Sequence, residues 1–286
     1  MKKITLSISL IIVNLITFAG GGWVHKAESG YSQFSYTFMS YSSISNGENG
    51  SLNLPRKVSD NTLQAYAEYG LSDKFELDLI FPYKMVSTST SLNSNFDPIY
   101  TDTLESGSLR GLGNTFTGIK YSLGEGKYAH AVRLGYGWNP GAPRPFLGLQ
   151  TGYSTNYLNA CYFISRGFKK SYINLDVAYQ LMGNNYSDYF ISNIEIGTKV
   201  NYSDKIYSWF AFVLHGYVAL EDKVERNPNY LYTGLNVNGE SDLSFGIKMN
   251  TYLNEHYSIT LGAYGAFLAK YQARAPSLNV GMAYEW

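Results

Sequence analysis

Apolar and polar residues alternate along most of the chain after its first thirty residues, which is the pattern of a β-strand with two different faces. In residues 242–253, Leu243, Phe245 and Ile247 fall on one face, and the residues that follow each of them are Ser, Gly and Lys. No helical periodicity follows the N-terminal segment. We therefore predict twelve strands, at residues 31–41, 62–71, 74–83, 113–123, 128–138, 155–166, 172–182, 190–202, 206–219, 242–253, 258–268 and 278–286.

The connections between these strands alternate strictly between long and short. Residues 43–60 and 84–111 are long connections, and turns such as "GEGK" (124–127) and "SDK" (203–205) are short. This is typical of an outer-membrane barrel, in which the turns at one end are short and the loops at the other end are long. An even number of strands returns both chain termini to the same side. Treating "GAPRPFLGLQTGY" (141–153) as a loop rather than a strand keeps the number at twelve.

A soluble sandwich of two sheets would also alternate, but its outer face would carry many charges. Here the polar face is mostly Gly, Ser, Thr, Asn and Gln, and the strands repeatedly end in Tyr, Phe or Trp, as at membrane interfaces. The segment 206–219 is apolar on both faces, so its sides stay unassigned. We predict an all-β transmembrane antiparallel β-barrel of about 12 strands over residues 20–286, located in the outer membrane of a Gram-negative bacterium.

The N-terminal segment indicates export. "MKK" is a basic region, and the apolar run that follows it has the length of the core of a signal peptide. Small residues before the "GGG" that follows place the cleavage after Ala19, with Gly20 as the alternative, so residues 1–19 are the expected signal peptide. A single membrane-anchoring helix is the competing interpretation, and the short run argues against it.

The chain ends "LNVGMAYEW" (278–286), an alternation that reaches the last residue. Tyr284 and Trp286 then face outward at the periplasmic lipid headgroups and are predicted to anchor the last strand. That strand must pair with the first, because an unpaired strand edge in lipid is costly. A terminal aromatic residue also resembles the signal read by the barrel-assembly machinery, so we expect that machinery, outer-membrane lipids and lipopolysaccharide as partners.

Composition narrows the function classes. The 22 basic and 22 acidic residues balance, so nothing favours nucleic acid. The single Cys161 excludes an internal disulfide and lies in an apolar stretch suited to packing. Of the four histidines only His256 is followed two residues later by a serine, Ser258, but His256 lies in a short turn, where a surface histidine without catalytic work is expected, and no His or Cys spacing suggests zinc. We predict no catalytic, cofactor-binding or metal-binding residues, and hence no enzyme.

Ten charged residues fall on the predicted inner faces of the strands, because a charge facing lipid at mid-depth is unfavourable. They form either a polar permeation path or an internal network of ion pairs that fills a narrow barrel, and the near balance of six acids and four bases favours the network. The candidates are Glu68, Glu76, Asp78, Lys120, Arg133, Asp176, Glu195, Lys199, Lys248 and Glu285.

Four stretches carry a family resemblance: the start "GGWVHKAESGYSQFSYTFMSYSS", then "YAEYGLSDKFELDLIFPY" (66–83), "GLGNTFTGIKYSL" (111–123) and "GYGWNPG" (135–141). Their order is similar to the outer-membrane β-barrel transporters of the phenol-degradation meta-pathway type, although Asn114 replaces the usual Asp. The resemblance implies passive passage or uptake of a small molecule, with a hydrophobic or aromatic ligand. A non-transport structural or envelope-associated barrel is the alternative, and an outer-membrane hydrolase is a third.

Overall fold

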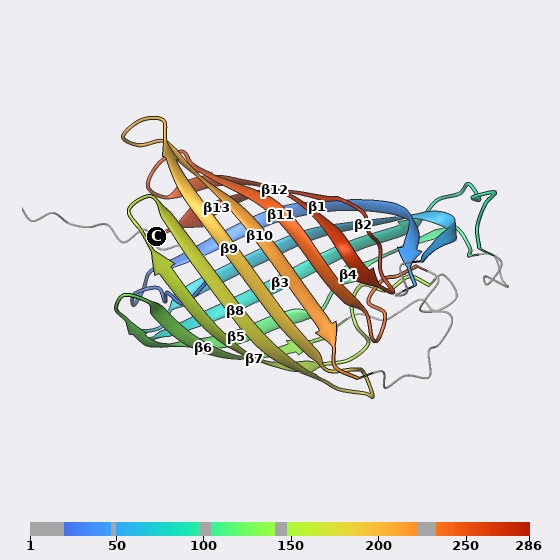
Figure 1. Cartoon of the computed structure of the whole chain (residues 1–286), viewed down its shortest axis with the longest axis horizontal. Coiled ribbons are helices and arrows are strands. Elements are labelled where there is room, and N and C mark those ends of the chain that lie inside the picture. Colours follow the sequence, from blue (N-terminus) through green and yellow to red (C-terminus); the bar gives the residue numbers. More distant parts are fainter. Residues whose placement is uncertain (1–19, 47–49, 98–103, 141–147, 222–232) are drawn as a thin grey trace, which may run out of the picture.

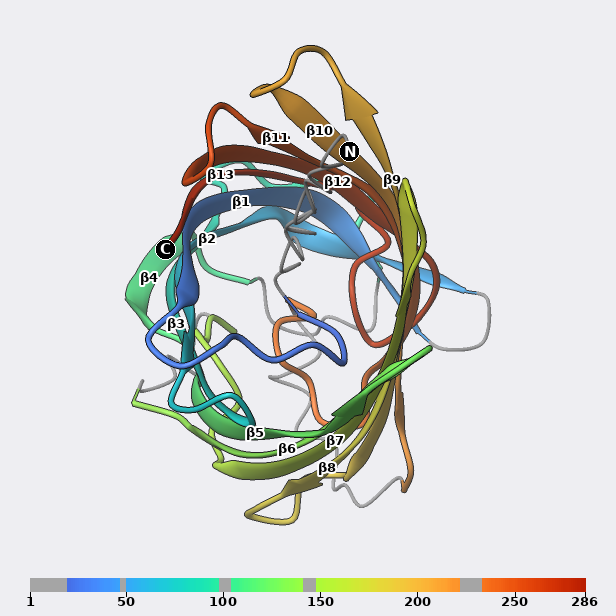
Figure 2. The ribbon, with the colours of Figure 1, turned by 90° about the vertical axis from the view of Figure 1, so that its left-hand side faces the viewer.

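The computed structural model describes residues 20–46, 50–97, 104–140, 148–221 and 233–286, and within them it forms one closed antiparallel β-barrel (Figure 1). The expected signal peptide, residues 1–19, lies outside the described residues. Among the residues that are described, no helix has the length and apolar character needed to cross a membrane. In Figure 2 the end of the barrel that carries the short turns faces the viewer.

Thirteen strands are present in this part of the chain, and the wall runs through them in sequence order. They are β1 Gly30–Ser45, β2 Ser51–Gly70, β3 Phe75–Thr88, β4 Gly107–Leu112, β5 Thr115–Glu125, β6 Ala129–Trp138, β7 Tyr157–Gly167, β8 Ser171–Met182, β9 Tyr189–Asn201, β10 Tyr207–Ala219, β11 Ser241–Tyr252, β12 Tyr257–Lys270 and β13 Ser277–Glu285.

The thirteen strands make a wall of twelve, because β4 and β5 both pair with β3 and together occupy one position. β4 pairs along the half of β3 that contains Tyr83–Thr88, and β5 pairs along the half that contains Phe75–Ile80. The barrel closes where β13 pairs with β1, from Tyr31 opposite Glu285 to Met39 opposite Ser277. The predicted class, strand number and closure are confirmed.

The last residue takes part in this closure. The backbone amide of Trp286 donates to the carbonyl of Gly30, and the amide of Gly30 donates back, both at 3.1 Å. A Cβ atom on Gly30 would come within 2.6 Å of the indole ring of Trp286, so glycine is required where the two strands meet. Tyr284 and Trp286 stack on the outer surface with their ring centroids 5.8 Å apart.

Two predicted boundaries are wrong at the long-loop end. Residues 43–60 were expected to form a loop, yet β2 begins at Ser51 and its first residues pair with the end of β1, Ser45 opposite Ser51. The expected connection 84–111 likewise contains the end of β3 and all of β4. Backbone hydrogen bonds hold these extensions, and such bonds do not require the apolar alternation that lipid imposes on the spanning part.

The predicted strand 113–123 begins two residues later than expected. Gly113 still donates to the carbonyl of Pro82 at 2.8 Å, but Asn114 leaves the strand and β5 starts at Thr115. The pairing of β5 with β6 ends at Thr115 opposite Trp138, and in the described residues β4 has only β3 as a partner strand. The wall beside β4 is therefore completed by a loop.

The outer and inner faces follow the predicted alternation. Ile247 and Met282 are 65% and 64% exposed on the outside, where acyl chains would surround them. In β10, whose faces the sequence left unassigned, Phe210 is exposed and Trp209 and Ala211 are buried. Thus Trp209 and Ala211 belong to the lumen.

Candidate functional site

The segment 20–29, which precedes β1 and is called the N-terminal plug below, crosses the lumen at the short-turn end (Figure 2). Its backbone amides donate to the barrel wall at three places: Gly22 to the hydroxyl of Ser165 at 2.7 Å, His25 to a carboxylate oxygen of Glu76 at 2.7 Å, and Glu28 to the carbonyl of Gly70 at 2.9 Å. Because these contacts come from distant strands, the plug is held across the opening.

Side chains of the plug pack against inward-facing residues of the barrel wall. Val24 packs into a buried cluster with Ala131, Cys161, Phe163 and Ala178, so Cys161 has the packing role that the sequence indicated. Trp23 packs against a second cluster. Close packing continues into the backbone, since a Cβ atom on Gly22 would lie 2.4 Å from the carbonyl oxygen of Ala129.

The plug is fixed by a buried group of charges, called the charged cluster: His25, Glu68, Glu76, Asp78, Lys120 and Arg133. The carboxylate of Glu76 lies 2.6 Å from Nδ1 of His25 and 2.9 Å from Nζ of Lys120. Arg133 pairs with Asp78 at 3.0 Å. Strand register brings these groups together, because Glu76 stands opposite Lys120 on β5.

Charge balance in this cluster depends on His25. Its three carboxylates face two permanent cations, Lys120 and Arg133, so a protonated imidazole makes the sum neutral. Burial by itself lowers the pKa of His25, but the hydrogen bond to Glu76 and the negative charges of Glu68 and Glu76 outweigh it, and the pKa is raised above 6.5. Contact with Glu76 therefore favours the protonated form of His25 in the seated plug.

The donor atoms of His25, Glu68 and Glu76 lie within 4.8 Å of one another, and these residue types are common metal ligands. However, Nζ of Lys120 already neutralises Glu76 and would repel a cation there. The geometry favours a proton shared between His25 and the carboxylates.

The remaining predicted charges also face the lumen but meet other partners. Lys248 pairs with Glu195 at 2.6 Å, and Tyr172 donates to the same carboxylate. Asp176 accepts a hydrogen bond from Asn193 at 3.2 Å, Glu285 accepts one from Tyr252 at 3.1 Å, and Nζ of Lys199 lies 3.6 Å from the centroid of the Tyr207 ring. The structure thus places five of the ten candidates in the charged cluster and the other five elsewhere.

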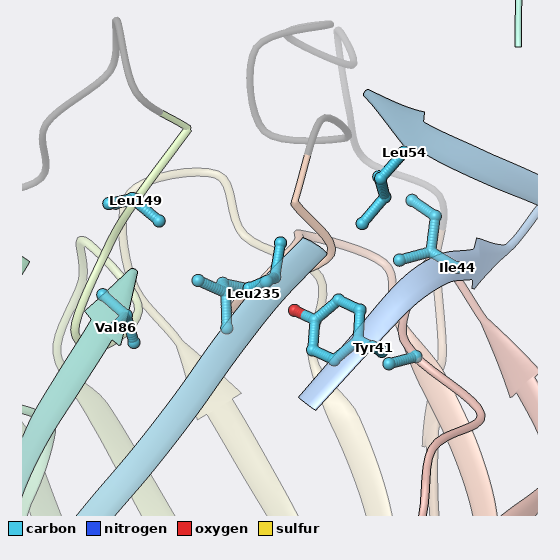
Figure 3. Close-up of a cluster of buried hydrophobic side chains, with 8 residues drawn as sticks. Tyr41, Ile44, Leu54, Val86, Leu149 and Leu235 are labelled. Atoms are coloured by element: carbon cyan, nitrogen blue, oxygen red, sulfur yellow. The ribbon is translucent and has the colours of Figure 1, made fainter. Parts of the chain in front are cut away.

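The long-loop end is closed by two loops, 148–155 and 233–240, called the extracellular cover. Leu149 and Leu235 from these loops pack into a buried apolar cluster with Tyr41, Ile44 and Val86 from the strand ends (Figure 3). The hydroxyl of Tyr41 donates to the carbonyl of Thr233 at 2.6 Å. Apolar burial therefore contributes to holding the cover at this end.

One acid is buried within the cover. Glu240 accepts hydrogen bonds from the hydroxyl of Tyr153 and from the amide of Val237. Burial, which these bonds only partly offset, raises the pKa of Glu240 to about 7. Packing of the cover therefore favours the protonated form of Glu240.

Asn114, at the interruption of the wall, attaches the cover to the barrel. Its side-chain oxygen accepts from the amide of Tyr153 at 2.6 Å, and its nitrogen donates to the carbonyl of Thr155 at 3.1 Å. Thr151 donates to the carbonyl of Leu112 at 2.8 Å, at the edge of β4. The residue that departs from the family pattern thus holds the loop that completes the wall.

Two cavities lie between the plug and the cover. The larger, called the central cavity, has a volume of about 490 Å³ and is lined by residues of β1–β3 and β8–β13. The smaller, about 290 Å³, lies beneath Leu235 and Glu240 of the cover. Tyr264 borders both cavities, and Cβ atoms on Gly246 or Gly262 would clash with its ring, so these glycines let the ring lie flat on the wall.

The N-terminal plug and the role of His25 were missed by sequence reasoning. The available signal was "GGGWV" (20–24), because glycines followed by two large apolar residues before the first strand are suited to close packing rather than to a solvated leader. The sequence predicted a polar lining. Which of its side chains contact one another depends on the stagger between strands, which the alternation of apolar and polar residues does not reveal.

Comparison with known proteins agrees with this architecture. An outer membrane channel from Pseudomonas putida F1 has a TM-score of 0.64 at 11% identity, covering 94% of this chain and 100% of that chain. The β domain of the Bordetella autotransporter BrkA has a TM-score of 0.51 at 12% identity, covering 91% and 100%. No family model matches the sequence, and no curated protein matches it. The similarities establish the fold of an outer-membrane barrel and agree with the resemblance found in the sequence.

Proposed function

We propose that this barrel is an outer-membrane channel whose resting state is closed and which passes a small molecule when the plug and the cover move. The observation that carries the proposal is the pair of cavities in the lumen, about 490 and 290 Å³, which share Tyr264 as a common wall residue. A barrel that served only as a scaffold would gain stability by filling this space with side chains.

Both closures are made by segments outside the spanning strands. The plug is a stretch of chain before β1, and the cover consists of connecting loops. Either could leave its seat without breaking a strand pair of the wall. Loops of this kind are the parts of proteins that move most readily.

The proposed ligand is a small molecule, in keeping with the cavity volumes. The family resemblance implies that this molecule is hydrophobic or aromatic. A structural or envelope-associated role without transport is the second candidate, and the extensive packing of the plug favours it. We propose passage rather than hydrolysis, since the buried carboxylates and His25 already serve to hold the plug.

Release of the plug tests the proposal. The double substitution Trp23→Ala/His25→Ala removes one packing contact and one charged contact, whereas Lys26→Ala changes an exposed side chain of the same segment. The protein is reconstituted into planar bilayers for conductance and into liposomes for solute-swelling assays. The double variant is expected to conduct and to admit solutes while Lys26→Ala behaves as the wild type. Absence of current and swelling in every variant, with folding intact, would support the structural role instead.

A further inference from the structure

We propose that the central cavity is a binding site for a neutral ring molecule that carries several hydroxyl groups, a chemistry shared by monosaccharides and polyhydroxylated aromatic compounds. The inference rests on the proposed function and adds the class of ligand. It is carried by the lining of the cavity, which combines aromatic rings, uncharged hydrogen-bonding groups and one internally neutralised ion pair.

Aromatic side chains form the part of the lining nearest the plug. Tyr172 and Trp209 meet edge to face with their centroids 5.3 Å apart, and Tyr252 belongs to the same buried cluster. Trp23 of the plug packs against this cluster from below. Such a surface offers a flat apolar face to the C–H face of a sugar or to an aromatic ring.

Amides and hydroxyls form the facing part. Gln33 donates to Thr260 at 3.3 Å, and Asn279 donates to Thr37 at 2.8 Å, so these side chains are already oriented. The Oδ1 atom of Asn250 is buried and has no hydrogen-bond partner in the described part of the molecule. A buried acceptor without a partner costs free energy, and a ligand hydroxyl would satisfy it.

The charges in the lining cancel. Lys248 and Glu195 are 2.6 Å apart, and Tyr172 also donates to Glu195, so the pair presents little net field to a ligand. An ionic ligand would lose its hydration without gaining an unpaired counter-charge. A hydrocarbon would leave Asn250 and the neighbouring amides unsatisfied. A neutral molecule with a flat face and several hydroxyls avoids the desolvation cost of an ion and can also form hydrogen bonds with these amides.

Equilibrium binding to the purified protein in detergent tests this assignment, with Gln64→Leu and Asn250→Leu as the altered cavities, since both side chains line the central cavity. Gln180→Leu is the matched control, because Gln180 has the same side chain and an inward position on β8 but lies outside the lining of the central cavity. The probes are glucose, catechol, toluene and glucuronate, measured by calorimetry. Heat-modifiable migration on gels verifies that each variant is folded.

Glucose or catechol is expected to bind more tightly than toluene and glucuronate, and each cavity variant is expected to weaken that binding at least tenfold while Gln180→Leu does not. The glucose and catechol arms decide between a sugar and a polyhydroxylated aromatic. Preference for toluene or glucuronate, or equal loss in Gln180→Leu, would overturn the assignment. Liposome swelling with unrelated solutes tests passage separately, so that the two proposals fail independently.

Discussion

The two ends of the lumen are closed by different kinds of interaction. At the short-turn end, the N-terminal plug is held by the charged cluster, in which Glu76 contacts both His25 and Lys120. At the long-loop end, the cover combines apolar packing of Leu149 and Leu235 with hydrogen bonds between uncharged groups, such as those of Asn114. Buried charges demand exact partners, whereas apolar contacts tolerate rearrangement.

This difference suggests different tasks for the two ends. The charged closure gives the plug one position and one register, because any shift would separate buried ions from their partners. The apolar cover can loosen by degrees, as expected of a segment that meets varied molecules from outside. Each end nevertheless contains a buried titratable group outside the strands whose pKa is shifted, His25 in the plug and Glu240 in the cover, so both can respond to pH.

Lys120→Met should have the largest effect, because it removes one of the two permanent cations that face the buried carboxylates Glu68 and Glu76. Breaking a buried ion pair from one side costs about 3–5 kcal/mol. Urea unfolding in detergent micelles, followed by tryptophan fluorescence, measures the loss. The double variant Lys120→Met/Glu76→Gln removes both charges and should recover more than half of it. If the single and double variants were equally unstable, packing rather than charge would hold this end.

The charged closure also shows how far sequence reasoning reaches. Alternation placed Glu76 and Lys120 on the inner faces, because lipid penalises outward charges and the strand period fixes the side. It did not reveal that Lys248 meets Glu195 across the intervening strand β10, since that contact depends on the stagger of the wall. The plug has no period at all, so only its packing in three dimensions identifies it.

The cover should weaken as pH rises. The pKa of Glu240 is about 7 in the packed cover and close to 4.5 when the loop is undocked, so its contribution to docking is fully present below pH 4.5 and is lost as pH rises through about 7. The difference corresponds to on the order of 3 kcal/mol. Hydrogen exchange of residues 233–240 at pH 5 and pH 8 measures it. Glu240→Gln should flatten this dependence, and an unchanged pH profile in that variant would assign the effect to another group.

Leu235→Ala tests the apolar part of the cover. Leu235 is 4% exposed and packs within the cluster shown in Figure 3. Truncating a buried leucine costs about 2 kcal/mol where the surroundings can relax, as expected for a loop. Faster proteolysis of the cover is the expected result. Leu92→Ala is the control, because Leu92 is 54% exposed at the same end, and equal sensitivity of the two variants would argue against apolar docking.

His25→Gln should give the smallest effect and separates the two ends. Glutamine can still donate to Glu76 but carries no charge, so the plug should lose about 1.5 kcal/mol at pH 6. Burial lowers the pKa of His25, but Glu76 and Glu68 outweigh it and raise the pKa above 6.5, so the contribution of His25 is fully present below pH 6.5 and declines as pH rises through the raised value. Hydrogen exchange of residues 20–29 should therefore accelerate with pH in the wild type and not in the variant. The cover should keep its own pH response in His25→Gln, since Glu240 is unchanged. A simultaneous loss of both responses would mean that the two closures are coupled through the lumen rather than independent.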